Sequence, residues 1–316
     1  MKKDKSSEEA FCTTIGGQAL IEGILMRGPE KQATVIRTKD GLVTKLETPK
    51  FLRERYKFFN LPIIRGGVTF VESMVYGVKA LSYSAELMPE EEQEKPSKLD
   101  VWIEKKFGTE KAQKFIIGLA VFLGICLSVG LFILLPTLLA GLVRHVSDST
   151  VVYNIAEGAF RIVIFLLYML FCTKMQDLKR VFQYHGAEHK AIACYERRLP
   201  LTVPNVREQS RFHPRCGTSF LFVVMFISIL VFSLVGWSNV WIRMGARLLL
   251  LPVVVGISYE IQRWSGRHDN WLSRGISAPG KALQRLTTAE PDDSMLEVAI
   301  ESLNLVIPDK PGVDIW

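Results

Sequence analysis

Two long stretches of the chain carry no charged residue. Residues 115–143 and 219–242 are uncharged over 29 and 24 positions and consist mainly of apolar residues. An α-helix rises about 1.5 Å per residue, so either stretch is long enough to cross a hydrocarbon layer about 30 Å thick. We therefore predict that both stretches are membrane-spanning helices.

Two further apolar stretches contain charged residues or adjoin them. Residues 151–172 include Glu157 and Arg161, and residues 248–259 are followed directly by Glu260. Such helices cross a membrane when their charged groups reach the headgroup region or face other helices. Otherwise they lie on the membrane surface. We favour four spans, which predicts a mainly α-helical, multi-pass membrane protein.

The distribution of basic residues predicts how the spans are oriented in the cell membrane. Residues 174–218 hold nine Lys or Arg and the first 114 residues hold twenty, whereas the spans and the opposite loops hold four. The positive-inside rule then places both termini and the central loop in the cytoplasm, as an even number of spans requires. We divide the chain into a cytoplasmic N-terminal region (1–112), a membrane domain (113–264) and a cytoplasmic C-terminal tail (265–316).

The N-terminal region contains three local patterns. Glycines punctuate an apolar run over residues 16–28, which suits a folded loop or the wall of a site. Apolar and polar residues alternate over residues 33–46 around a Lys-Asp-Gly turn, which predicts a β-hairpin. Over residues 65–87 apolar residues recur at spacings of three and four. This predicts an amphipathic helix that packs on the spans or lies in the membrane interface.

The central loop contains a cluster of polar residues with the spacing of a metal site. His185, Glu188 and His189 project from one face of a helix, because positions i, i+3 and i+4 are neighbours there. This is the spacing of a His-x-x-Glu-His zinc motif. We expect this helix to continue directly from the second span with the motif on its buried side. A metal ion would remove the cost of burying these groups without partners.

A catalytic zinc ion takes three protein ligands and keeps one position open for water. His185 and His189 supply two ligands, and Glu188 is then the general base that takes a proton from the water that the metal activates. The third ligand comes from another segment, for which the sequence offers these candidates in order of preference: His213 and Cys216, then Glu260, then Glu22 and Glu72. A closed site in which both His213 and Cys216 join the two histidines would instead be structural.

Charged residues in the spans bear on the alternative function, and the basic surface bears on the expected partners. Charged residues within or beside the predicted spans, namely Glu157, Arg161 and Glu260, favour a second class of function. In that class the chain is a transport or scaffold protein whose site holds a structural metal or relays protons. The basic surface is explained by anionic lipid headgroups. No basic stripe with interleaved aromatic residues is present, so membrane lipids and not nucleic acid are the expected partners.

Four segments of the chain also resemble a known family: GGQALIEGILMRGP, HGAEHKAIACYE, FHPRCGTSF and APGKALQRLTTAEP. Together they resemble the YqhQ-like family of bacterial membrane proteins, a domain-of-unknown-function family described as predicted metal-dependent enzymes. The resemblance covers roughly residues 11–305 and implies no particular substrate. It implies a multi-pass membrane protein with a metal site on five residues: His185, Glu188, His189, His213 and Cys216.

These observations lead to one functional hypothesis. We expect a metal-dependent membrane enzyme, a hydrolase that works at the cytoplasmic leaflet with zinc as its metal. Its location favours a lipid-linked or membrane-protein substrate. The alternative is the non-catalytic transport or scaffold protein described above.

Overall fold

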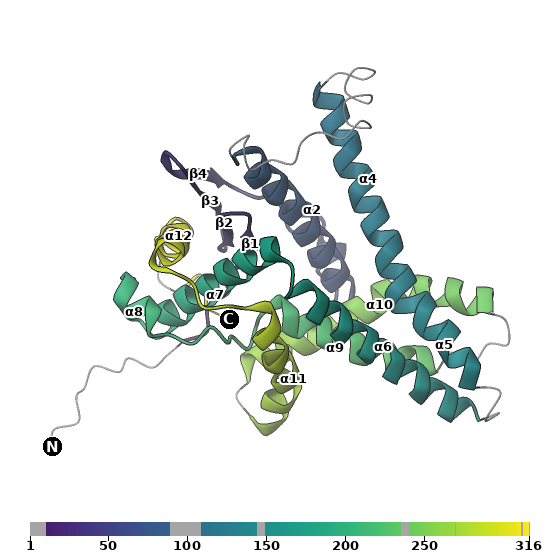
Figure 1. Cartoon of the computed structure of the whole chain (residues 1–316). Helices are drawn as coiled ribbons and strands as arrows, with labels where there is room; N and C mark the ends of the chain where they lie inside the picture. The colour runs from purple at the N-terminus through teal and green to yellow at the C-terminus, as the bar shows by residue number, and fades with distance from the viewer. Residues whose placement is uncertain are drawn as a thin grey trace. The chain divides into compact units, whose positions relative to one another are not determined.

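The computed structural model describes residues 11–88, 109–143, 149–234, 240–268, 270–310 and 312–315. The chain forms two compact units, which we call the sheet unit and the helical unit. The sheet unit takes in the described residues within three segments: 1–87, 169–230 and 249–316. The helical unit takes in those within two segments: 88–168 and 231–248. Figure 1 labels their elements along the chain, most of which are helices, as the sequence predicts.

The sheet unit begins with a four-stranded antiparallel sheet in the order β1-β2-β3-β4. Its strands are β1 (Gly16–Leu20), β2 (Gly23–Arg27), β3 (Gln32–Thr38) and β4 (Gly41–Glu47). The hairpin predicted over residues 33–46 is confirmed as β3 and β4. Gly41 has a φ of 128° at the turn, a backbone conformation that favours glycine.

The first two strands were not predicted, because the glycine-rich motif shows no alternation of apolar and polar residues. In β2 the residues from Gly23 to Met26 are all buried. Ile24 and Met26 pack into the main core, whereas Leu25 packs on the other face of the sheet with Leu20 and Ala80. A strand covered on both faces reads as a continuous apolar run, so the sequence gives no signal with a period of two.

The remaining elements are helices. In the sheet unit they are α1 (Leu52–Arg55), the 3-10 turn η1 (Lys57–Asn60), α2 (Ile64–Glu86), α7 (Gln176–Glu196), α8 (Val203–Arg207), most of α9 (Gly217–Ser233), α11 (Trp271–Thr287) and α12 (Asp293–Asn304). The helical unit contains α4 (Thr109–Val129), the π-helical turn η2 (Gly130–Leu134), α5 (Leu135–Val143) and most of α6 (Thr150–Cys172). Helix α10 (Val240–Arg267) begins in the helical unit and ends in the sheet unit.

The main core of the sheet unit lies between the sheet, α7 and α12. Met26 and Val35 from the sheet, Ala191 from α7 and Leu296 from α12 have no exposed surface. Helix α12 begins at a capping residue, Asp292, whose side chain accepts a hydrogen bond from the backbone N–H three residues later. This core fixes α7 against the sheet, which determines where the motif of the central loop lies.

The motif helix does not continue from the second span, contrary to the prediction. Helix α6 ends at Cys172 and α7 begins at Gln176. Met175 between them has a φ of −77° and a ψ of 124°, so the backbone is extended at this point and the helical hydrogen bonding stops. The break allows α7 to pack in the sheet unit with its own orientation.

Within the described ranges, three helical segments have the length and apolar composition needed to cross a membrane. They are Phe115–Val143, Val151–Cys172 and Met244–Arg267. Helix α9 is apolar but shorter, with 17 residues. The chain is therefore a membrane protein with three to four apolar helices of membrane length.

Two predicted span boundaries are wrong. The predicted span 219–242 is not one helix, because α9 ends at Ser233 and Ile242 belongs to α10. The predicted span 248–259 is the middle of α10, which has 28 residues. Charged residues were taken as the limits of that span, but Arg247 is only 2% exposed and continues the helix inside the protein.

Arg247 belongs to a buried charge cluster in the helical unit. One of its guanidinium nitrogens donates a hydrogen bond of 2.7 Å to Glu157 of α6, and Arg161 donates another of 2.9 Å to the same carboxylate. Thr137 of α5 also accepts a hydrogen bond from Arg247. The charges on these helices therefore face one another, which is the condition under which charged residues are tolerated in spans.

Helix α2 confirms the amphipathic helix predicted over residues 65–87, but its apolar face is the exposed one. Val71, Met74 and Val75 are 45–58% exposed. The buried face consists mainly of small residues, such as Gly77 and Ala80. A helix with this distribution packs on protein through its small residues and presents its large apolar side chains outward.

Candidate metal centre

Helix α7 carries the His-x-x-Glu-His motif into the interior of the sheet unit. Tyr184, Ala187 and Ala191 of the same stretch have no exposed surface and pack in the main core. Glu188 and His189 are buried with them, at 5% and 2% exposure. Both side chains thus lie on the buried side of the helix, as the sequence pattern predicts.

Three potential metal ligands converge at this point. One donor atom each from His185, His189 and Cys216 lies within 4.8 Å of the others. The two imidazole rings are 4.4 Å apart between centroids, and Nε2 of His185 lies 3.1 Å from Sγ of Cys216. Cys216 directly precedes α9, so two separate segments build the group. Of the proposed third ligands, Cys216 is the one that the structure brings to the two histidines.

Backbone carbonyl groups hold both histidine rings. Nδ1 of His185 donates a hydrogen bond of 2.8 Å to the carbonyl of Thr287, and Nδ1 of His189 donates one of 2.6 Å to the carbonyl of Arg211. A carbonyl oxygen can only accept, so both Nδ1 atoms carry the proton and both Nε2 atoms present a lone pair when the rings are neutral. Metal-binding histidines are typically oriented in this way.

Glu188 lies against the first strand of the sheet. Its Oε1 accepts a hydrogen bond of 3.0 Å from the backbone N–H of Gly17, whereas its buried Oε2 has no hydrogen-bond partner among the described residues. A Cβ atom on Gly17 would lie 3.0 Å from Cδ of Glu188 and 2.8 Å from the carbonyl oxygen of Leu25. Only glycine fits this position, so the glycine-rich motif forms a wall of the site.

The charges of the group stabilise one another. Burial raises the pKa of the Cys216 thiol, but the imidazoles of His189 and His185 more than offset this and bring it well below its ordinary value. Burial lowers the pKa of His185, but the neighbouring Cys216 thiolate outweighs it and raises this pKa to about 9. Burial also raises the pKa of the Glu188 carboxyl. The group therefore favours the thiolate, which is the form of cysteine that binds metals.

His213 does not join the three converging ligands. Its Nε2 lies 3.1 Å from Oε2 of Glu196, and its ring centroid is 5.7 Å from that of His189. Burial, together with the nearby His189, lowers the pKa of His213 to about 4, so its ring is neutral. Arg215 pairs with the same Glu196 carboxylate and limits its effect on the histidine. His213 and Cys216, three residues apart in sequence, thus point to different partners.

Gln284 of α11 positions the segment that carries His213, and sequence reasoning did not identify it. This side chain is fully buried. Its Oε1 accepts a hydrogen bond of 2.8 Å from the backbone N–H of His213, and its Nε2 donates one of 2.7 Å to the carbonyl of the same residue. The available signal was its place inside the APGKALQRLTTAEP segment, which also supplies the Thr287 carbonyl.

The three glutamates proposed as ligands lie elsewhere and have other partners. Glu260 forms a paired contact with the guanidinium of Arg65. Glu22 pairs with Arg180. Glu72 accepts a hydrogen bond of 2.7 Å from the backbone N–H of Leu52. None of these carboxylates belongs to the group of three ligands among the described residues.

Comparison with known proteins places this chain in a family. The family model described as "Protein of unknown function (DUF1385)" matches residues 61–309. The chain belongs to the DUF1385 family. It is also 36% identical over 300 residues to the uncharacterized protein YqhQ of Bacillus subtilis (strain 168), a similarity that covers 92% of this chain and 91% of YqhQ. No solved structure matches it.

The matched region of this DUF1385 chain includes all three converging ligands, whereas the sheet precedes it. One cysteine thiolate and two imidazoles form a donor set suited to zinc and other transition metals. The structure meets two further conditions for such a site. Backbone carbonyls hold both Nδ1 atoms, which leaves the Nε2 atoms as the ligand atoms, and the buried Oε2 of Glu188 is unpartnered among the described residues. The residues present therefore fit a metal ion with three protein ligands.

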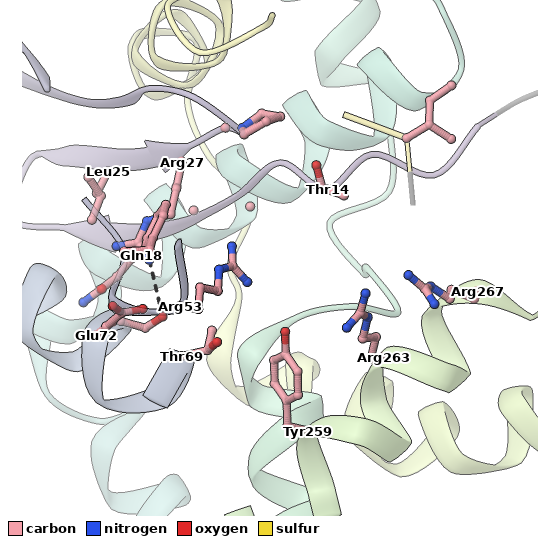
Figure 2. Close-up of a pocket in the computed structure, with 17 residues that line it drawn as sticks. Thr14, Gln18, Leu25, Arg27, Arg53, Thr69, Glu72, Tyr259, Arg263 and Arg267 are labelled. Atoms are coloured by element: carbon pink, nitrogen blue, oxygen red, sulfur yellow. Dashed lines mark hydrogen bonds between the residues drawn. The ribbon is translucent and has the colours of Figure 1, made fainter. Parts of the chain in front are cut away.

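A cavity borders the strand that contacts Glu188. It has a volume of about 600 Å³, and Gly16 and Gly17 of β1 form part of its wall. Figure 2 shows its polar side chains, among them Arg53, Arg263 and Arg267. Gly17 thus borders the cavity and also donates a hydrogen bond to Glu188.

Proposed function

We propose that this DUF1385 protein is a metal-dependent hydrolase of the cell membrane that acts at the cytoplasmic leaflet. One observation carries the proposal: His185, His189 and Cys216 present three ligand atoms within 4.8 Å, beside the buried carboxylate of Glu188. Zinc is the metal we propose, because it prefers nitrogen and sulfur ligands and catalyses hydrolysis from sites with three protein ligands. The cytoplasm would keep Cys216 reduced and available.

The residues around the site support a catalytic and not a closed structural centre. Among the described residues, His213 is the one further histidine near the group, and it is engaged with Glu196 and lies outside the three ligands. Three protein ligands leave a coordination position for water, whereas structural zinc sites are closed by four. When bound, the ion would act as a Lewis acid and activate a water molecule for attack on the substrate.

Glu188 is the general base in this proposal. The backbone N–H of Gly17 holds Oε1, which leaves Oε2 to accept a proton from water. The carbonyl groups of Thr287 and Arg211 keep the two imidazole rings in fixed orientations. A site attached to membrane-length helices favours a lipid-linked or membrane-protein substrate.

Replacement of Glu188 by Gln tests the catalytic role. Wild-type protein and Glu188→Gln are reconstituted in vesicles with zinc and incubated with a panel of lipid-linked and membrane-peptide esters and amides. We expect hydrolysis of at least one panel member by the wild type, and a loss of about 100-fold or more in the variant with zinc content and thermal stability unchanged. Glu208→Gln, an exposed carboxylate in the same loop, is the matched control and retains activity.

Equal hydrolysis by wild type and Glu188→Gln would contradict the assignment of Glu188 as the base.

A second candidate function, transport or a membrane scaffold with a structural or proton-relaying site, is favoured by one observation. Glu157, Arg161 and Arg247 form a hydrogen-bonded charge cluster inside the helical unit. On that hypothesis Glu188→Gln causes little change, or a loss of stability in step with metal loss.

A further inference from the structure

The cavity beside β1 is lined by an excess of positive charge. Among the described residues of its wall are four arginines, Arg27, Arg53, Arg263 and Arg267, and one carboxylate, that of Glu72. The side chains come from β2, α1, α2 and α10, four elements that are distant in sequence. Like charges brought together in this way repel one another, and an anion bound in this cavity of about 600 Å³ would reduce that repulsion.

The arginines point into one space. In Figure 2 the guanidinium groups of Arg53, Arg263 and Arg267 and the hydroxyl of Tyr259 are directed toward the middle of the cavity. Neither Arg53 nor Arg263 has a carboxylate within 4.0 Å among the described residues. Planar guanidinium groups donate paired hydrogen bonds whose geometry matches the oxygens of phosphate.

Arg27 and Glu72 form the buried end of this cavity. The Nε atom of Arg27 is buried without a hydrogen-bond partner among the described residues, and its guanidinium lies 4.9 Å from the ring centroid of Tyr76. Glu72 is 8% exposed, and its Oε2 also has no hydrogen-bond partner in the described part of the chain. The buried Nε of Arg27 can donate to an oxygen of an anionic ligand, whereas Oε2 of the Glu72 carboxylate can only accept and would pair with a protonated oxygen of the ligand.

The cavity lies at the end of a membrane-length helix. Arg263 and Arg267 belong to the last turns of the segment Met244–Arg267. Helix α2, which contributes Glu72 to the wall, exposes Val71 and Val75 on another face. Basic side chains at the end of a span and large apolar side chains directed outward are both features of the headgroup level of a membrane.

We infer that this cavity binds a phosphate-bearing ligand through Arg53 and Arg263. The phosphate belongs either to a lipid headgroup or to a soluble phosphate ester, and the position at the end of a span favours the lipid. As the anchor of a substrate, this site rests on the proposed hydrolase, because Gly17 connects the cavity wall to Glu188. As a binding site, it is independent of the metal.

Binding measurements on the full chain in a phosphate-free detergent test this inference. Inorganic phosphate, glycerol 3-phosphate and dihexanoyl phosphatidic acid are titrated by calorimetry. We expect saturable binding that weakens about tenfold or more in Arg53→Gln and in Arg263→Gln, each of which removes one charged donor. Arg285→Gln, an exposed arginine of α11 outside the cavity, is the matched control and binds as the wild type does.

The three probes distinguish a lipid ligand from a soluble phosphate ester. Tighter binding of phosphatidic acid than of glycerol 3-phosphate identifies a lipid ligand, and equal binding identifies a soluble ester. Undetectable binding of all three probes, or equal binding by the cavity variants and Arg285→Gln, overturns the inference. Circular dichroism and thermal unfolding of the two cavity variants, which alter different elements, establish that they are folded.

The same titration distinguishes this inference from the proposed function. Protein with His189→Ala, which lacks one proposed metal ligand, retains phosphate binding if the cavity acts as we infer. Loss of phosphate binding in cavity variants that keep their zinc supports the site and leaves the metal centre unaffected. A wild-type protein that holds zinc but binds no phosphate refutes the cavity site alone, and one that binds phosphate but no zinc refutes the metal centre alone.

Discussion

Two backbone carbonyl groups determine how the histidines of the central loop can act. Because the carbonyls of Thr287 and Arg211 bind the Nδ1 protons, the Nε2 atoms of His185 and His189 are the ones left for an ion. The spacing of the motif predicts that both rings share a face, but not which nitrogen each would offer. Thr287 is 102 residues from His185, and no local pattern predicts such a contact.

Gly17 provides a direct test of how Glu188 is held. We expect Gly17→Ala to lower the free energy of unfolding by about 1–3 kcal/mol and to displace Glu188, because the new Cβ would meet its Cδ at 3.0 Å. Gly16→Ala is the matched control, since its Cβ meets no atom within 4 Å. Thermal unfolding in detergent measures the difference. Equal stability of the two variants would show that β1 does not pack on Glu188 as described.

His213 makes stability depend on pH in the metal-free protein. Its pKa is lowered from 6.5 to about 4 by burial, so the unfolded chain binds its proton first as the pH falls. The free energy of unfolding therefore decreases from about pH 6.5 down to about pH 4, by up to about 3 kcal/mol. We expect His213→Gln to show a smaller decrease over this range in thermal unfolding. Parallel curves for the two proteins would refute the buried neutral state.

At the scale of elements, the helical unit depends on a carboxylate shared by two arginines. Glu157→Gln would leave Arg161 and Arg247 buried without their counter-charge, so we expect a loss of about 3–5 kcal/mol. Glu297→Gln removes an exposed partner of Arg37 and should cost about 0–1 kcal/mol. Thermal unfolding in the same detergent compares the two. A small effect of Glu157→Gln would mean that water reaches the cluster.

Helix α2 should contact lipid through its exposed apolar face. Val71, Met74 and Val75 lie on that face. We expect a photoreactive amino acid at position 75 to crosslink to phospholipid in vesicles, whereas the same group at Thr44, an exposed position of β4, should not. Mass spectrometry identifies the crosslinked product. Equal lipid labelling at both positions, or none at position 75, would exclude this orientation of α2.

The sequence predicts elements well where the pattern has a simple period. The α2 helix and the β3–β4 hairpin follow the spacing of their apolar residues. Strands β1 and β2 were not predicted. Because β2 is buried on both faces, its sequence shows no alternation of apolar and polar residues. The ends of α10 were not predicted either. In the sequence Arg247 was taken as a limit of the span, whereas its burial beside Glu157 allows the helix to continue through this residue.

At the scale of the whole molecule, the distribution of basic residues predicts that both termini and the central loop lie in the cytoplasm. Residues 1–87, 169–230 and 249–316 belong to the sheet unit, so the chain leaves this unit and comes back twice. We expect reporter fusions at both termini and within the loop at 200 to report a cytoplasmic location. An external signal from any of the three would contradict it.

The candidate site could be predicted only in part, because spacing along the sequence predicts contacts within one helix but not contacts between distant segments. Its two histidines and its acid lie on one helix, where spacing alone predicts a common face. Cys216 stood among five candidate third ligands, because the choice depends on how α9 packs against α7. Gln284 and the cavity arginines depend on tertiary contacts over long separations, for which the sequence offers no periodic signal.

The metal content of the purified protein tests the central claim most directly. Wild type, Cys216→Ala and Cys194→Ala are purified in parallel, and zinc is measured by plasma mass spectrometry with X-ray absorption to detect sulfur coordination. Cys194 is a fully buried cysteine of α7 outside the ligand group, so it controls for the loss of a buried thiol. We expect about one zinc ion per chain in the wild type and in Cys194→Ala, and much less in Cys216→Ala. A wild-type chain that neither retains nor takes up zinc, manganese or iron, or a Cys216→Ala variant that binds metal as the wild type does, would contradict the account.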